Sequence, residues 1–408
     1  MKRPITFGSE YRSLRNRLNN LIASNKRLYY RTQFEINQGN CKKTWDLISQ
    51  ILNRKKLAFK ETSLSINDFQ VSDRLQVSEY FNDYFCNVAT ELTSQIPNQL
   101  VSFESFLTGD YSSSFCLREI LPCEIETIIL NLKETSVGHD GIPCKVLKSI
   151  SSIISVPISV VINDSIRIGE FPDELKVSKI VPVFKSGLSD QMNNYRPISI
   201  LTTISKIFEK FLCEQILYLE KKNILTKYQF GFRKKISTDV AIANFLKDVV
   251  EGVDSGEYCI GVFLDLRKAF DLVNHQILFK KMEFYGIRGI VLSLVKSYFS
   301  NRFQYVSING VLSNKTKLNN IGVPQGSVLG PLFFLIYIND LIYSSSFLKF
   351  SLFADDTTIF CKSTNIDELY DKCNLELNHV MRWISANKLI LNYDKTVYML
   401  FTGRKFYK

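Results

Sequence analysis

Apolar positions in the first quarter of the chain recur at steps of three and four residues, the period of an amphipathic helix. The first such region covers residues 11–60, and a second covers 72–91. In the second region, the apolar side of the expected helix consists of Leu75, Tyr80, Phe81, Tyr84, Phe85 and Val88. A stretch rich in Ser, Pro and Gly then runs from about residue 93 to 114 and predicts a linker.

The pattern changes after residue 121, where short apolar strands alternate with helices and sharp turns. We expect strands at 179–184, 258–266, 305–308, 349–354 and 357–361. We expect helices at 203–221, 275–285, 329–343 and 366–387. This mixture predicts an α+β domain built around an antiparallel sheet.

Composition indicates a folded chain with a basic N-terminal region. Hydrophobic residues make up 45% of the 408 residues, which allows a sizeable core and excludes an intrinsically disordered or collagen-like protein. Residues 1–60 hold fourteen Lys or Arg but only three Asp or Glu, so this stretch accounts for the whole net charge of +11. Such a segment attracts nucleic acid or an anionic membrane surface, unless it is simply a solvated basic helix.

Three other classes of protein find little support in the sequence. The longest charge-poor apolar regions, 149–163 and 322–339, are interrupted by Ser, Asn, Gly and Pro, so no membrane span is expected. The opening residues MKRPITFGSEYRS lack the apolar core of a secretory signal. The nine cysteines form no C-x-x-C pair, which indicates neither a zinc site nor a disulfide framework. We therefore expect a reducing, intracellular setting.

Three aspartates stand where predicted strands end. Asp265 closes the apolar strand CIGVFLD, and Asp355 and Asp356 join the two apolar halves of FLKFSLFADDTTIFC. Because adjacent strand residues point to opposite faces, one carboxylate of the pair can face a cleft while the other lies beside it. Carboxylates flanked by apolar strands need neutralising, and Mg²⁺ prefers their oxygens. A bare Asp-Asp pair is also a common turn dipeptide, so this pair alone does not decide the function.

Neighbouring strings complete a larger set. FLDLRKAFD (263–271), GVPQGSVLGPLFFLIYIND (322–340), FADDTTIF (353–360) and NKLILNYDKT (387–396) follow VPVFKSGLSDQMNNYRPISILTTISKIFEK (181–210) and QFGFRKKISTDVAI (229–242). Together they resemble the reverse transcriptase domain of non-LTR, LINE-type retrotransposons, in particular the jockey-like branch. The similarity extends through SVGHDGIPCKVLK (136–148) and, more weakly, YFNDYF (80–85), and it covers roughly residues 70–402.

The resemblance implies an RNA-directed DNA polymerase with the fingers and antiparallel palm sheet of the right-hand polymerase fold. It divides the chain into a basic helical N-terminal extension with its linker (1–115), the start of the fingers (116–170) and the fingers and palm domain (171–408). The implied partners are an RNA template, a DNA primer and deoxynucleoside triphosphates; the oligomeric state stays open.

The resemblance also assigns the metal site. It implies that Asp265, Asp355 and Asp356 hold two Mg²⁺ ions, for which Mn²⁺ can substitute. One ion would activate the primer 3′-hydroxyl, and the other would bind the triphosphate and stabilise the leaving pyrophosphate. Asp271 lies near the same turn, and we interpret it as a helix cap or surface charge rather than a ligand.

Further residues match the family's nucleotide-binding positions, although each also has an ordinary structural interpretation. Phe270 corresponds to the residue whose bulk would clash with a ribose 2′-hydroxyl; otherwise it is a core Phe. Gln325 and Gly326 match the loop against the templating base and nucleotide; otherwise they form a helix-entry turn. Three cations match positions that hold the triphosphate or the departing pyrophosphate, and otherwise are surface charges: Lys185, Arg196 and Lys395. A structural role is expected for His139, His275 and His379.

Two departures from the family pattern bear on activity. No endonuclease-like sequence precedes Met1, and the chain ends at 401–408, ahead of the strands that grip the primer and of the helical thumb. We therefore expect the thumb to be largely absent, an open edge on the palm sheet and poor processivity. One alternative is a truncated, inactive relic that only binds nucleic acid. Another is a group II intron-type maturase, which the NNYRPIS and FADDTTIF strings favour less.

Overall fold

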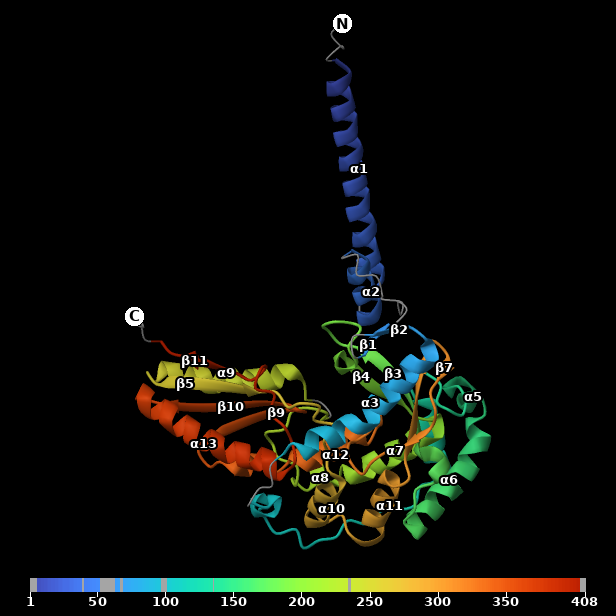
Figure 1. The fold of residues 1–408 in the computed structure, drawn as a ribbon, viewed down its shortest axis with the longest axis vertical. Coiled ribbons are helices and arrows are strands. Elements are labelled where there is room, and N and C mark those ends of the chain that lie inside the picture. Colours follow the sequence, from blue (N-terminus) through green and yellow to red (C-terminus); the bar gives the residue numbers. More distant parts are fainter. Residues whose placement is uncertain are drawn as a thin grey trace. The chain divides into compact units, whose positions relative to one another are not determined.

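The computed structural model describes residues 6–38, 40–51, 63–66, 69–96, 101–134, 136–233 and 236–403 (Figure 1). Parts of the predicted N-terminal helix (52–60), of the linker (97–100) and of the C-terminal end (404–408) lie outside these residues. The chain divides into two compact units, Met1–Thr62 and Ser63–Lys408.

The first unit consists of two helices, α1 (Thr6–Ile36) and α2 (Cys41–Ile51). The prediction of helix is confirmed for both segments, but the prediction of one continuous region is wrong, because residues 37–40 separate them. The physical reason is a cap: the Asn40 side chain accepts a hydrogen bond from the backbone N–H of Lys43 at 3.1 Å and starts α2. Apolar and basic side chains of α1, such as Leu18 and Arg15, are alike exposed within this unit.

The second unit mixes helices and strands, which confirms the α+β prediction (Figure 1). Its α-helices are α3 (Arg74–Ser94), α4 (Pro122–Leu130), α5 (Cys144–Ser149), α6 (Ser151–Ile168), α7 (Thr203–Ile216), α8 (Tyr218–Lys221), α9 (Thr238–Asp254), α10 (His275–Phe284), α11 (Gly289–Phe299), α12 (Gly330–Ile338) and α13 (Ile366–Ala386). Its 3₁₀-helices are η1 (Phe103–Phe106), η2 (Asp173–Lys176), η3 (Met192–Asn194) and η4 (Leu341–Ser344).

Within the described residues, the strands of this unit form three sheets. They are β1 (Leu64–Ile66), β2 (Phe69–Val71), β3 (Val177–Phe184), β4 (Tyr195–Ile200), β5 (Tyr258–Leu264), β6 (Phe303–Ile308), β7 (Val311–Leu312), β8 (Thr316–Lys317), β9 (Lys349–Phe353), β10 (Asp356–Ser363) and β11 (Val397–Phe401). All the expected strands are present. The helix expected at 329–343 ends at Ile338 and is followed by η4; between the two, the Asn339 side chain bonds the backbone of Thr226 and Ile224.

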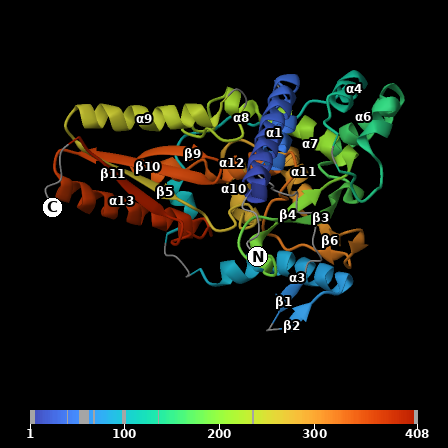
Figure 2. The same cartoon turned by 90° about the horizontal axis from the view of Figure 1, so that it is seen from above.

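The four-stranded sheet has the order β11-β5-β10-β9, and its pairs are all antiparallel. It lies between α9 and α13 (Figure 2). Alternation along β10 explains this arrangement, because Phe360 packs with Val249 of α9 whereas Cys361 packs in the cluster that contains Cys373 of α13. With both faces covered, polar chemistry is left to the strand ends and loops.

The second large sheet has the order β4-β3-β6-β7, with β8 also paired to β6. Its β3–β6 pair is parallel and the others are antiparallel. Helix α3 packs against β6, and the buried Phe81 makes an edge-to-face contact with Tyr195 of β4. The third sheet is the small β1–β2 pair.

Helix α6 is the one described helix that is long and apolar enough to cross a membrane by length and composition alone. It contains Pro157 and packs against α4 and α11. A core helix of a folded domain passes the same test of length and composition.

Candidate active site

The loop between β9 and β10 places a carboxylate at one end of the strands of the four-stranded sheet. This loop consists of Ala354 and Asp355, and Asp356 is the first residue of β10. Pairing of Thr357 with Leu264 continues the register so that Asp265, the residue after β5, lies across from Asp356. The predicted hairpin is thus confirmed, with Asp355 half-buried and Asp356 exposed.

The carboxylates of Asp265, Asp355 and Asp356 at these strand ends repel one another. Burial raises the pKa of Asp355, and the neighbouring charges of Asp356 and Asp265 raise it further. The guanidinium of Arg196 opposes this rise without cancelling it. Carboxylates that are partly buried and repel one another are stabilised by any additional positive charge placed among them.

Asp265 is hydrogen-bonded to the turn that precedes β11. Its Oδ2 accepts a hydrogen bond from Asn392 Nδ2 at 2.7 Å, and its backbone oxygen accepts one from the Asn392 N–H at 2.8 Å. The Thr396 hydroxyl lies 3.5 Å from the Asp265 backbone nitrogen. Asn392 therefore fixes the orientation of the Asp265 carboxylate while leaving its second oxygen for other partners.

Three cations lie next to the carboxylates. Lys185 directly follows β3, Arg196 pairs with Val183 across β3 and β4, and Lys395 belongs to the turn before β11. Burial lowers the pKa of Lys185, and the adjacent charges of Lys395 and Arg196 lower it further, whereas Asp265 raises it. The cations repel one another, and an anion between them would be stabilised.

Phe270 lies in the segment between β5 and α10. Its half-buried ring stacks on Phe334 of α12 with centroids 4.6 Å apart. Phe232 approaches the same ring edge-on at 6.1 Å and has a left-handed backbone, with φ of 56°. These contacts fix the plane of the Phe270 ring.

The predicted loop residues Gln325 and Gly326 lie against β4. The Ser199 N–H donates to the Gln325 backbone oxygen at 2.6 Å. Gly326 has φ of 112°, and a Cβ there would lie 2.6 Å from the Ser199 oxygen, so only glycine fits without displacing the strand.

Asp271 is not the helix cap or surface charge that we expected. Asn274 caps α10, because its side chain accepts from the Ile277 N–H at 3.1 Å. The Asp271 Oδ1 instead accepts a hydrogen bond from Gln325 Nε2 at 2.7 Å, and burial raises the pKa of Asp271. Asp271 thereby orients the Gln325 amide, with its Oε1 directed away from Asp271.

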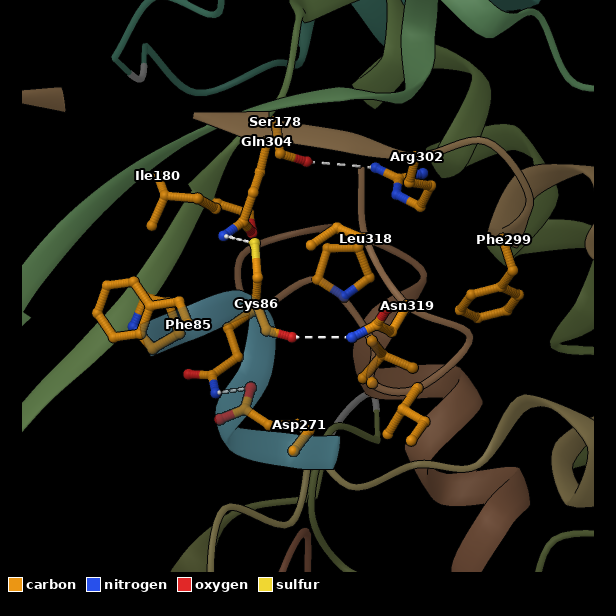
Figure 3. Close-up of a pocket in the computed structure, with 18 of the residues that line it drawn as sticks. Phe85, Cys86, Ser178, Ile180, Asp271, Phe299, Arg302, Gln304, Leu318 and Asn319 are labelled. Carbon is orange, nitrogen blue, oxygen red and sulfur yellow. Dashed lines mark hydrogen bonds between the residues drawn. The ribbon is translucent and has the colours of Figure 1, made fainter. Parts of the chain in front are cut away.

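Behind this loop is a cavity of about 70 Å³ with a mixed polar and apolar lining. Its lining includes Asp271, Ser178 and the buried Arg302, which donates to the Ser178 hydroxyl at 3.4 Å (Figure 3). His275 also lines it and lies 2.7 Å through Nε2 from the Gly322 oxygen. Burial lowers the pKa of His275 to about 4, and this contact fits the structural role expected for it.

A buried carboxylate that the sequence did not reveal holds the start of α12. Glu209 of α7 accepts hydrogen bonds from the Tyr298 hydroxyl at 2.8 Å and from the Val328 N–H at 2.6 Å. Its side chain is fully buried, and burial raises its pKa. Glu209 therefore fixes the backbone that follows Gln325 and Gly326. In the sequence, Glu209 is one of three charged residues in ISKIFEK (204–210), and nothing local marks it as buried.

The donor set fits a hard divalent cation. Asp265 and Asp355 supply carboxylate oxygens, and burial together with the charges of Asp356 and Asp265 raises the pKa of Asp355. Within the described ranges, no three His, Cys, Asp or Glu side chains converge tightly enough to form a complete metal centre. Mg²⁺ commonly uses one or two protein carboxylates and completes its shell with water and substrate phosphates, so two carboxylates suffice.

A carboxylate cluster beside a cation cluster, with an aromatic ring and a glycine loop near them in the sequence, is an arrangement typical of phosphoryl-transfer enzymes. Comparison with known proteins identifies the family. The family model for "Reverse transcriptase (RNA-dependent DNA polymerase)" matches residues 183–406, more than half of the chain. The chain belongs to this family.

Its relatives are proteins of mobile elements. It is 31% identical over 293 residues to the "Probable RNA-directed DNA polymerase from transposon X-element" of Drosophila melanogaster, a match that covers 70% of this chain and 32% of the relative. It is 26% identical over 312 residues to the "RNA-directed DNA polymerase from mobile element jockey" of the same species, with 74% and 34% covered.

A third relative is the "Putative 115 kDa protein in type-1 retrotransposable element R1DM" of Drosophila melanogaster, at 27% identity over 285 residues. This match covers 69% of the chain and 27% of the relative. The predicted assignment to the non-LTR reverse transcriptases is confirmed. The chain spans about a quarter to a third of the length of these relatives.

Proposed function

We propose that this chain adds deoxynucleotides to a primer 3′-hydroxyl on an RNA template. The observation that carries the proposal is the adjacency of a carboxylate cluster and a cation cluster. One holds Asp265 and Asp355, and the other holds Lys185, Arg196 and Lys395. A nucleoside triphosphate bound with a divalent cation has the charges that both clusters lack.

In this proposal, bound Mg²⁺ supplies Lewis acidity at the primer hydroxyl and at the triphosphate, and Mn²⁺ can replace it. The family resemblance favours two such ions, with Asp356 as a third carboxylate. The chain's own residues position the reactants. Asn392 holds Asp265 in place, Arg196 offers a bidentate contact to phosphate, and Lys395 is the candidate to neutralise the pyrophosphate.

Sugar and base selection are assigned to neighbouring residues. Phe270, fixed by its stack on Phe334, is the candidate barrier to a 2′-hydroxyl. Gln325, oriented by Asp271, is the candidate contact to the nucleotide beside the templating base. On this basis the four-stranded sheet corresponds to the polymerase palm, and the sheet of β3 and β4 to the fingers. The functional division at residues 115 and 170 stays a prediction.

A primer-extension assay tests the function. With an RNA template, a DNA primer and Mg²⁺, the wild-type chain should extend the primer, and Asp355→Asn should lose at least about a hundredfold in rate. Asp394→Asn is the matched control, because Asp394 lies in the nearby turn, is exposed and pairs only weakly with Arg267 at 3.8 Å. Equal extension by wild type and Asp355→Asn would defeat the assignment, and template-primer binding without extension would favour a binding-only relic.

The basic first unit is proposed to bind the template RNA. The exposed cations of α1, which include Arg12, Arg15 and Arg31, support this, because binding to a nucleic-acid backbone is mainly electrostatic. Deleting residues 1–60 should lower RNA affinity and flatten its dependence on salt. An unchanged affinity with an unchanged salt slope would show that this unit does not bind RNA.

A further inference from the structure

The turn that carries Asp355 has an unusual backbone. Ala354, the first loop residue, has φ of 58°, in the left-handed region that residues other than glycine rarely adopt. The loop contains only Ala354 and Asp355, so the backbone at Ala354 sets where the Asp355 carboxylate points. A strained conformation of this kind persists only where the surroundings hold it.

A single buried side chain, that of Gln229, contacts the Ala354 backbone and stabilises this conformation. Oε1 of Gln229 accepts hydrogen bonds from the Ala354 N–H at 3.0 Å and from the Gly231 N–H at 2.8 Å. Nε2 of Gln229 lies 3.5 Å from the Ala354 oxygen. Its amide therefore contacts the backbone on both sides of the strained residue, and Gln229 is only 2% exposed.

The backbone around Gln229 forms two hydrogen bonds with β9, which we call the backbone brace. The Phe230 N–H donates to the Leu352 oxygen at 2.7 Å, and the Leu352 N–H donates to the Tyr228 oxygen at 2.8 Å. These bonds form a parallel bridge between Gln229 and Leu352. A Cβ on Gly231 would lie 2.2 Å from the Ala354 nitrogen, so the segment approaches the turn as closely as a backbone can.

We infer that Gln229 is a positioning residue that holds the Ala354–Asp355 turn in the conformation Asp355 needs to bind a divalent cation. The inference rests on the proposed function, in which Asp355 contacts that cation. Because Mg²⁺ demands near-ideal octahedral geometry, a small displacement of one ligand matters. Partners that orient a metal ligand typically change metal affinity or activity about 10- to 100-fold when they are removed.

Amide hydrogen exchange tests the clamp, that is, the hydrogen bonding of Gln229 to the Ala354 backbone. The measurement needs no enzymatic activity. In the wild-type chain, the Ala354 N–H should be strongly protected although it lies at a loop tip. Gln229→Met keeps the length and removes both acceptor and donor, and the Ala354 amide should then exchange at least tenfold faster. Tyr228→Phe is the matched control, because its partly exposed ring lies next in the chain and the backbone brace is kept.

Single-nucleotide incorporation kinetics test the consequence. In Gln229→Met, the maximal rate per folded molecule should fall about 10- to 100-fold, with little change in KM for the nucleotide or in template-primer affinity. The ratio of Mn²⁺-supported to Mg²⁺-supported activity should rise, which a purely structural role would not cause.

Rapid exchange of the Ala354 amide in the wild-type chain would overturn the inference, even if Gln229→Met failed to fold. So would faster exchange in Gln229→Met with unchanged Mg²⁺ kinetics, since the clamp would then not position a ligand. If the wild-type chain incorporates no nucleotide, the proposed function fails, and the exchange measurement still decides whether Gln229 holds the turn.

Discussion

A completely buried ion pair behind the site offers a sharp test of how the domain is held together. Lys281 of α10 and Asp340, just after α12, are both fully buried and bonded to each other. The Lys281 Nζ also donates to the Tyr337 oxygen at 2.6 Å, and Trp383 Nε1 of α13 donates to the other Asp340 oxygen at 3.1 Å. One carboxylate thus joins three helices.

Replacing Asp340 by Leu leaves the Lys281 ammonium buried without a counter-charge. Breaking a buried pair in this way costs about 3–5 kcal/mol in the free energy of unfolding. Burial lowers the pKa of Lys281, so the lysine can lose its proton in the variant, and this limits the cost. The double variant Lys281→Met/Asp340→Leu removes both charges and should lie within about 1.5 kcal/mol of wild type.

Urea unfolding followed by tryptophan fluorescence measures these differences, because Trp383 contacts the pair directly. The chain has one other tryptophan, Trp45, which is exposed and gives a background that changes little. A cost below about 1 kcal/mol for Asp340→Leu would refute the reasoning. So would a double variant no more stable than Asp340→Leu, since the unpaired charge would then not be the cause.

Three further predictions concern the site. Asn392→Ala frees the Asp265 carboxylate and should lower the incorporation rate about 10- to 100-fold without changing the melting temperature, whereas an unaffected rate would show that Asp265 needs no such support. Phe270→Ala should raise ribonucleotide use relative to deoxyribonucleotide use at least about tenfold in competition assays, and an unchanged ratio would reassign Phe270 to the core. In an NMR titration, the pKa of the Asp355 carboxyl should lie above the range of ordinary aspartates, so its cation-binding, ionised form is lost as pH falls through that raised pKa. Asp356→Asn should lower the pKa of Asp355, because it removes a neighbouring negative charge. A rise in this pKa would contradict the proximity of the two carboxylates.

The sequence predicted the strand hairpin and its aspartates because both depend on local pattern. The apolar runs on either side of Ala354–Asp356 have the period and length of paired strands, and the register follows from the short loop. The expected helix starts at residues 275 and 366 agree with α10 and α13, where the structure shows that the side chains of Asn274 and Asn365 are the caps.

The residues that support the site could not be predicted in this way. Gln229 and Ala354 are 125 residues apart, and Asn392 and Asp265 are 127 apart. Nothing local distinguishes such a polar residue from a surface one, because its partner is chosen by the tertiary fold. Asp271 shows the same limit, since its position after a turn resembles a cap until Gln325 is seen beside it.

The proposed function requires Asp265 and Asp355 to bind a divalent cation between them. Replacing Mg²⁺ by Fe²⁺ and generating hydroxyl radicals at the bound iron tests this directly, because the backbone is then cut near the ion. We predict cleavage at both residues 264–267 and 353–357, suppressed by excess Mg²⁺ and lost in Asp355→Asn but kept in Asp394→Asn. Cleavage near only one of the two segments, or cleavage that survives in Asp355→Asn, would contradict the claim.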